Sequence, residues 1–320
     1  MTPAQASRRG ELFASGGVLL TAAGWGSMVP LTSVLLASLP PFVIAATRYT
    51  LAVPVLALLI AIIERRAVLP LYLPWRRVLA LGTFGIGGFA TCYTLGIRYS
   101  GPIAAAAILA TGPVVAALMD WAIGGRRVSR RAGLAIALTV AGGLLVAIAR
   151  PERSASAHGG EALLVLGLVC WTWYSMKAQA WLGPLGIGQL RLTMVTSAAA
   201  GFSLWIVFAV TTLLGLQDPP AAWPSLEALL ILGYLCAGPT AICIALWNLG
   251  TAHLGVTIAM VILNLSPVFA VLLSLALGIE PTALELIGGS LTLLGVAWLQ
   301  FGGGRRVPAS PSVDAAGELR

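Results

Sequence analysis

The sequence predicts an all-α polytopic membrane protein, with ten transmembrane helices in two inverted five-helix repeats. The first reason is composition. Of the 320 residues, 58% are hydrophobic and only 9% are charged, which is too little charge for the surface of a soluble protein. The second reason is the length of the uncharged runs, several of which reach the roughly 20 residues that a helix needs to cross a bilayer. The third reason is an internal repeat.

The repeat relates residues 96–124 of the first half to residues 250–278 of the second half. At a constant offset the matched pairs are Gly96/Gly250, Gly101/Gly255, Ala105/Ala259, Ile108/Ile262, Leu109/Leu263, Pro113/Pro267, Val114/Val268, Ala116/Ala270, Leu118/Leu272 and Gly124/Gly278. Each copy begins at a glycine and contains an uncharged run of about 20 residues with a proline inside it. Two such copies in one hydrophobic chain are typical of a transporter built from a duplicated unit.

The apolar runs predict the individual helices in order. In the first half they predict helices near residues 12–36, 41–63, 76–98, 102–123 and 131–149. In the second half they predict helices near residues 161–182, 187–214, 227–251, 255–278 and 283–302. Pro40 and Pro41 mark the first turn, and a polar segment at 150–160 separates the halves. The predicted domains are therefore two repeats, 11–149 and 160–302, with cytoplasmic tails at 1–10 and 303–320.

Arginine is distributed unevenly over the segments between the predicted helices. With the N-terminus in the cytoplasm, the inner segments contain Arg8, Arg9, Arg65, Arg66, Arg76, Arg77, Arg126, Arg127, Arg130, Arg131, Arg305 and Arg306, and the outer loops contain Arg98, Arg150 and Arg153. Cytoplasmic loops of membrane proteins are enriched in basic residues, so both termini are predicted to be cytoplasmic. Because each half has an odd number of helices, the second half enters the membrane in the opposite direction. The repeat is therefore predicted to be inverted.

Several short motifs resemble those of one known family. They are Gly24-Trp25-Gly26-Ser27, Arg48-Tyr49, the pattern from Gly96 to Pro113, and the late run Ser266-Pro267-Val268 … Leu277-Gly278-Ile279-Glu280-Pro281-Thr282 … Gly288. In this order, over about residues 11–302, the chain resembles the EamA-type ten-helix branch of the drug/metabolite transporter superfamily. The resemblance implies two inverted halves, cytoplasmic termini and movement of small metabolites, often out of the cell. The first half departs from the pattern, because Arg126 stands where the second half has Glu280.

Inverted repeats predict a substrate site at their interface and transport by alternating access. We therefore expect a secondary, non-ATP transporter of small metabolites in the bacterial cytoplasmic (inner) membrane, exporting amino acids or related carboxylates. The alternatives are an intramembrane enzyme and a channel. An enzyme would need clustered catalytic groups at one depth, whereas His158 and His253 lie in predicted loops. A channel would need a polar selectivity segment, and none stands out. The net charge of +8 is explained by the arginine clusters, so no nucleic-acid partner is predicted.

Ionisable and polar side chains inside predicted helices indicate the substrate site, because a membrane makes them costly. The predicted substrate-binding residues are Trp25, Arg48, Tyr93, Trp173, Tyr174, Lys177, Trp247, Asn248 and Asn264. Arg48 and Lys177 either extend to the membrane surface or face a cavity, where they would attract an anionic group of the substrate. Pro113 and Pro267 each remove a backbone hydrogen bond, so they are predicted to act either as hinges or as simple packing kinks.

The positions of the cysteines and carboxylates bear on cofactors and coupling ions. The four cysteines, Cys92, Cys170, Cys236 and Cys243, fall inside apolar runs without metal-ligand spacing, so neither a metal nor a cofactor is predicted. Protons are a candidate partner besides the substrate and the lipid bilayer. However, Asp120, Glu280 and Glu285 lie near predicted helix ends and no carboxylate falls in the middle of a helix, so proton coupling stays open.

Overall fold

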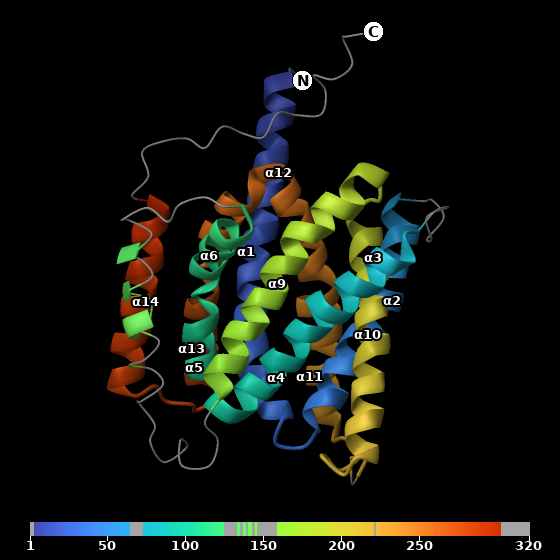
Figure 1. Cartoon of the computed structure of the whole chain (residues 1–320), viewed down its shortest axis with the longest axis vertical. Coiled ribbons are helices and arrows are strands. Elements are labelled where there is room, and N and C mark those ends of the chain that lie inside the picture. Colours follow the sequence, from blue (N-terminus) through green and yellow to red (C-terminus); the bar gives the residue numbers. More distant parts are fainter. Residues whose placement is uncertain are drawn as a thin grey trace.

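The chain is helical over nearly all of the residues that the computed structural model describes, which are 3–64, 73–124, 159–220 and 222–301 with a few positions between 133 and 145 (Figure 1). No β-strand occurs within these ranges. Among the described residues, five helices are long and apolar enough to cross a membrane: Leu12–Leu35, Pro41–Glu64, Trp75–Ser100, Gln189–Leu213 and Leu226–Leu254. The prediction of an all-helical protein with several apolar spans is confirmed. Of the predicted fifth helix, 131–149, the structure describes eight positions, all of them helical, and the others lie outside the described residues.

The helices of the first half follow the predicted order. They are α1 (Pro3–Leu35), α2 (Pro41–Leu59) with the π-helical turn η1 (Ile60–Glu64), α3 (Trp75–Ala80), the π-helix η2 (Leu81–Gly87), α4 (Gly88–Ser100), α5 (Pro102–Leu109) and α6 (Gly112–Gly124). The predicted helix 102–123 is thus divided at Ala110 and Thr111. Proline has no N–H group, so Pro113 cannot donate to the carbonyl of Leu109, and α5 ends at that residue.

The helices of the second half contain a break at the corresponding place. They are α9 (Gly160–Leu182), the 3₁₀ turn η3 (Gly183–Leu185), α10 (Gln189–Leu213), α11 (Leu226–Leu235), the π-helix η4 (Cys236–Ile242), α12 (Cys243–Leu263), α13 (Ser266–Ala276) and α14 (Ala283–Phe301). The helix α12 ends at Leu263, four residues before Pro267, just as α5 ends four residues before Pro113. The offset that relates Gly96 to Gly250 therefore also relates the two breaks.

One predicted turn is absent from the second half. The sequence predicts a turn between residues 251 and 255, but α12 runs through this segment. In the first half the matching turn forms at Gly101, which has a φ of 80° and is followed by Pro102 at the start of α5. In the second half Val256 follows the matching Gly255. Unlike proline, valine can continue the hydrogen bonds of a helix, so the helix is not interrupted there.

The packing of the first half corresponds to the packing of the second. The helix α1 packs against α12 and α13, while α9 packs against α4, α5 and α6. Likewise α2 packs on η4, α10 packs on η2, and α2 and α10 pack on each other. Figure 1 shows α1 running downward from the N-terminus, whereas α9 runs upward toward that end. The corresponding helices therefore make matching contacts while running in opposite directions.

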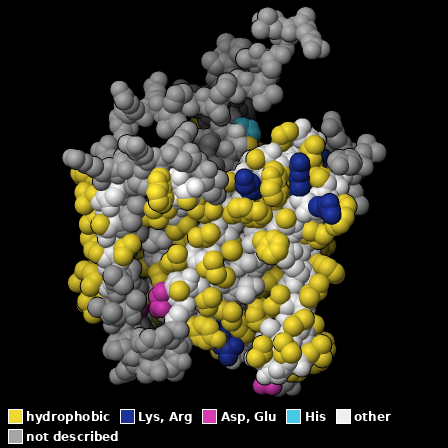
Figure 2. All heavy atoms as spheres, in the orientation of Figure 1, with side chains coloured by type: hydrophobic (Ala, Val, Ile, Leu, Met, Phe, Trp, Pro, Cys, Tyr) yellow, Lys and Arg dark blue, Asp and Glu magenta, His cyan; other side chains and the backbone are white. Residues whose placement is uncertain are grey.

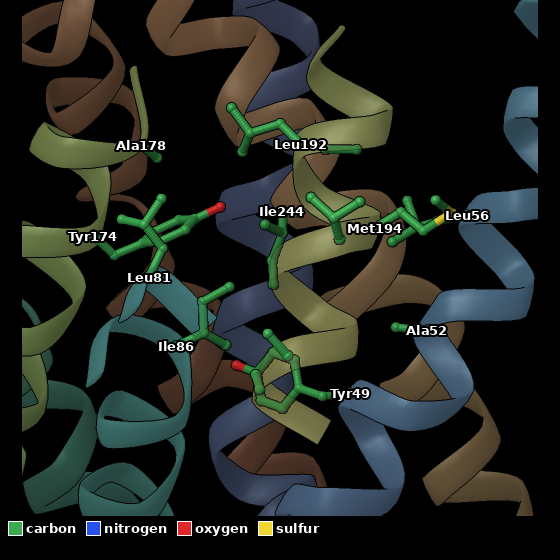
Figure 3. Packing of buried hydrophobic residues seen from close by; sticks show 14 of the residues in the cluster. Tyr49, Ala52, Leu56, Leu81, Ile86, Tyr174, Ala178, Leu192, Met194 and Ile244 are labelled. Atoms are coloured by element: carbon green, nitrogen blue, oxygen red, sulfur yellow. The ribbon is translucent and has the colours of Figure 1, made fainter. Parts of the chain in front are cut away.

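Burial along the helices also repeats. In α2 the buried residues from Ile44 onward are Ile44, Ala45, Ala46, Arg48, Tyr49, Ala52 and Leu56. Counted from the start of α10, the same positions are Leu192, Thr193, Met194, Thr196, Ser197, Ala200 and Leu204, and all are buried. Figure 3 shows part of the core that these residues form between α2, α9 and α10. By this correspondence, Arg48 of α2 matches Thr196 of α10.

The outer surface of the described residues is mostly apolar. Figure 2 shows hydrophobic side chains over most of the face in view, with lysine and arginine side chains nearer its two ends. Large side chains on this surface include Leu58 (60% exposed), Phe84 (68%) and Phe202 (65%). A belt of exposed apolar side chains between polar ends is the surface expected of helices that face lipid.

Candidate functional site

A cavity of about 100 Å³ lies at the meeting of the two halves. It is bordered by α1, α2, α4 and α5 from the first half and by α9, η4, α12 and α13 from the second. Its wall is apolar except for a few groups, of which Arg48 is the one charged side chain among the described residues that line it. The cavity therefore combines an aromatic, apolar wall with a single positive charge.

Arg48 is held at this cavity by neutral groups. Its side chain is 2% exposed, its Nε donates to Thr240 Oγ1 at 3.2 Å, and its Nη2 donates to the sulfur of Met28. The guanidinium carbon lies 5.8 Å from the centre of the Tyr49 ring and 5.9 Å from that of Tyr93, within the range of cation–π attraction. Within the described part of the chain, no carboxylate lies within 4.0 Å of it. A buried cation without an acidic partner is costly, and an anionic ligand would reduce that cost.

Aromatic rings from three helices form one wall of the cavity. The Trp25 and Trp171 rings meet edge to face with their centroids 5.2 Å apart, and Phe89 lies 5.3 Å from both Trp171 and Tyr93. The Trp25 indole donates to the carbonyl of Pro239 at 2.9 Å, which fixes its ring. Such rings offer a rigid, polarisable surface for the apolar part of a ligand.

In the part of the chain that the structure describes, two cavity-lining side chains have a buried oxygen without a hydrogen bond. These oxygens are the Tyr93 hydroxyl oxygen and Thr172 Oγ1. Thr32 is close enough to influence the Tyr93 hydroxyl, but neither oxygen makes a hydrogen bond of acceptable geometry. Buried polar atoms in proteins are nearly always paired, so these two oxygens are available to a bound solute or to water.

Both helix breaks open onto the cavity. Leu109 and Ala110 line it at the break between α5 and α6, and Leu263 and Asn264 line it at the break between α12 and α13. Interrupted helices are tolerated at membrane depth where their backbone is buried in protein or lines a cavity. Each half therefore has an irregular backbone segment that borders the cavity between the halves.

Comparison with known proteins identifies the family. The model of the EamA-like transporter family matches residues 10–148 and 158–301. The chain belongs to the EamA-like transporter family. It is 27% identical over 239 residues to the uncharacterized transporter YyaM of Bacillus subtilis (strain 168), covering 72% of this chain and 74% of that one. A solved crystal structure with 20% sequence identity covers 90% of this chain and 96% of its own, with a TM-score of 0.62, which supports the fold alone.

This family membership, together with the apolar helices, makes the protein an integral membrane transporter. Of the predicted substrate-binding residues, Trp25, Arg48, Tyr93 and Asn264 line the cavity of this EamA-like transporter, as does Pro267. Pro113 is the second residue of α6, and its side chain lies outside the described part of the chain. Whether either proline acts as a hinge stays a prediction.

The remaining predicted residues do not themselves line the cavity. Tyr174 and Trp247 are 0% exposed and Asn248 is 2% exposed. The Tyr174 ring lies 5.3 Å from that of the cavity-lining Trp171, and the Trp247 ring lies 5.7 Å from that of the cavity-lining Trp25. Trp173 and Lys177 are half-buried on α9, where the Trp173 ring meets Trp181 edge to face at 5.7 Å. Within the described residues, the predicted substrate-binding residues therefore form two groups. One group lines the cavity, and the other does not.

Sequence reasoning missed several residues of the cavity wall. They include Met28, Tyr49, Phe89 and Trp171. Trp171 had a recognisable signal, because it stands in α9 where Trp25 stands in α1, and the buried positions of the two helices match. One face of α9, with Leu168, Trp171 and Thr172, borders the cavity, and Trp173 lies on another face of the helix. Tyr174 packs beside Trp171, with the ring centroids 5.3 Å apart, without lining the cavity itself.

Proposed function

We propose that this protein is a secondary transporter that moves small carboxylate-bearing metabolites, such as amino acids, by alternating access between two inverted five-helix repeats. The observation that carries the proposal is the buried guanidinium of Arg48 on an otherwise apolar cavity, with no carboxylate of the described residues within 4.0 Å. A carboxylate forms short, two-fold hydrogen bonds with a guanidinium, and these are strong in a site of low dielectric constant. The volume of about 100 Å³ suits a small solute.

The proposal of two inverted repeats is supported by three independent correspondences. The breaks before Pro113 and Pro267, the buried positions of α2 and α10, and the contacts of α1 and α9 all repeat between the halves. Corresponding helices also run in opposite directions (Figure 1). In proteins of this kind, a site at the interface of the repeats becomes accessible from each side in turn. The cavity occupies this position.

The experiment that tests the function is counterflow in proteoliposomes. A panel of amino acids and organic acids is screened for saturable exchange, with and without a pH gradient. We expect exchange of at least one class of carboxylate, and an effect of the gradient would identify proton coupling. Absence of exchange across the panel by protein that is folded by size-exclusion chromatography would reject the carboxylate proposal.

The role of Arg48 is tested by substitution. We expect Arg48→Met to reduce exchange more than tenfold because the anion loses its charged hydrogen bonds, and Arg48→Lys to retain part of it because a single charge remains. Arg98→Met is the matched control, since Arg98 is exposed in the last turn of α4. Equal exchange by Arg48→Met and the unmodified protein would move the anion site elsewhere.

A further inference from the structure

A second cluster of polar side chains lies outside the cavity, where α9, α10 and α12 meet. Asn248 Nδ2 donates to Thr193 Oγ1 at 2.8 Å, and the Tyr174 hydroxyl lies 3.4 Å from Thr196 Oγ1. Tyr174, Thr193 and Thr196 are 0% exposed and Asn248 is 2% exposed. We call these four residues the α9–α10–α12 cluster. So many polar groups inside a membrane protein suggest more than packing.

The cluster corresponds, through the repeat, to the surroundings of Arg48. When α1 and α9 are aligned by their buried positions, Met28 corresponds to Tyr174. When α2 and α10 are aligned in the same way, Arg48 corresponds to Thr196. Even the contact is repeated, because Arg48 bonds to Met28 just as Thr196 approaches Tyr174. Two members of the cluster, Tyr174 and Thr196, therefore have counterparts that line the cavity in the first half, while they themselves are packed shut.

We propose that the α9–α10–α12 cluster is a second lining of the transport pathway, which is closed in this structure and opens when the transporter faces the other side. The proposal rests on the inverted repeats of the proposed function. In such proteins the two halves exchange conformations. Residues that line the open cavity in one half therefore correspond to residues that are packed together in the other half. After the exchange, the second set lines the open pathway and the first set is packed together.

Contacts at one end of the molecule hold the cluster closed. Tyr174 lies between the cavity-lining Trp171 and the end of α9 at Leu182, and Figure 3 shows its ring at a different level from that of Tyr49. At this end Glu64, the last residue of η1, forms an ion pair with Arg191 in the first turn of α10. The ion pair joins the first half to the second. Breaking it should therefore let the helices at this end separate, so that solvent can reach the cluster.

The test measures how readily a thiol within the cluster reacts. Thr196→Cys is introduced into full-length protein whose four natural cysteines are replaced, and the protein in liposomes is treated with a small cationic methanethiosulfonate. We expect slow labelling. Adding Glu64→Arg places like charges together, so labelling should become at least fivefold faster. Reversing the partner as well, with Arg191→Glu, should restore the slow rate.

Controls make the result specific to the pathway. Thr193→Cys, a second position of the cluster, should respond in the same way. Thr21→Cys is the matched control, because Thr21 is also 0% exposed but is bonded to Gly17 and Cys243 carbonyls in the contact of α1 with α12, so it should stay unlabelled throughout. Labelling of both cluster thiols that does not depend on the ion pair, or a rise at Thr21→Cys as well, would overturn the proposal.

The same proteins separate this proposal from the proposed function. Counterflow of the carboxylate panel is measured on the cysteine-replaced parent. If labelling responds to the ion pair while no carboxylate is exchanged, the closed pathway is supported and the carboxylate function is rejected. If carboxylates are exchanged while labelling does not respond, the transporter stands and the α9–α10–α12 cluster is a structural feature of the core.

Discussion

At the scale of single residues, the motif Gly24-Trp25-Gly26-Ser27 illustrates how a short sequence serves one site. Trp25 forms part of the cavity wall, and the Ser27 hydroxyl bonds to the Gly24 carbonyl at 2.8 Å and to the Tyr234 hydroxyl at 2.7 Å. Gly24 faces Cys243, so α1 and α12 approach closely there. The motif thus positions one aromatic ring while it brings the neighbouring helices together.

Tyr93 gives a prediction at this scale. Its hydroxyl is buried beside the cavity without a hydrogen bond. We expect Tyr93→Phe to reduce substrate exchange about fivefold, because one net hydrogen bond contributes about 1 kcal/mol. The melting temperature should stay the same or rise, because an unpaired buried hydroxyl is removed. Tyr99→Phe, at an exposed position of the same helix, should change neither quantity; unchanged exchange in Tyr93→Phe would exclude the hydroxyl from binding.

At the scale of elements, close contacts between helices place the breaks at the cavity. Gly26 of α1 faces the first turn of α13: a Cβ atom there would lie 2.5 Å from the Ser266 carbonyl oxygen and 2.6 Å from the Phe269 Cβ. Helices in membranes associate through such small residues because lipid provides no hydrophobic drive between them. The approach of α1 holds the start of α13, and with it Asn264, against the cavity.

This contact gives a prediction about stability. We expect Gly26→Ala to destabilise the protein by about 1–3 kcal/mol, because the methyl group meets backbone that cannot move aside. Thermal unfolding in detergent measures the effect. Gly16→Ala is the control on the same helix, since a Cβ atom at Gly16 has nothing within 4 Å. Equal melting temperatures for the two variants would contradict the tight contact between α1 and α13.

Sequence reasoning located most helices, because uncharged runs bounded by arginine or proline define them strongly. It did not place the breaks at Ala110 and Asn264, although Pro113 and Pro267 determine them, because proline was expected to kink each helix rather than divide it. Of the residues that it predicted for substrate binding, Trp25, Arg48, Tyr93 and Asn264 line the cavity, and their role in binding stays a prediction. It could not tell which face of α9 borders the cavity, because that helix is apolar on several sides and only tertiary packing distinguishes them.

At the scale of the whole molecule, the opposite directions of α1 and α9 lead to a prediction of topology. With the N-terminus in the cytoplasm, the start of α3 should lie inside and the start of α9 outside. Single cysteines at Arg76, which is exposed, and at Glu161, in the first turn of α9, should therefore react with an impermeant thiol reagent from opposite sides. Position 160 is unsuitable, because a Cβ atom there would lie 2.9 Å from the Tyr99 Cβ. Labelling from the same side would reject the inverted arrangement.

The pairing of Arg48 with Thr196 has a consequence for how such a protein can be assembled. A symmetric molecule made from two copies of the first half would bury a second guanidinium where Thr196 packs in the α9–α10–α12 cluster. Two like charges in a medium of low dielectric constant repel each other, and each would need an anionic partner to offset its burial. With threonine at one position, the chain buries one such cation instead of two. The divergence of the halves thus removes a repulsion between like charges that exact symmetry would impose.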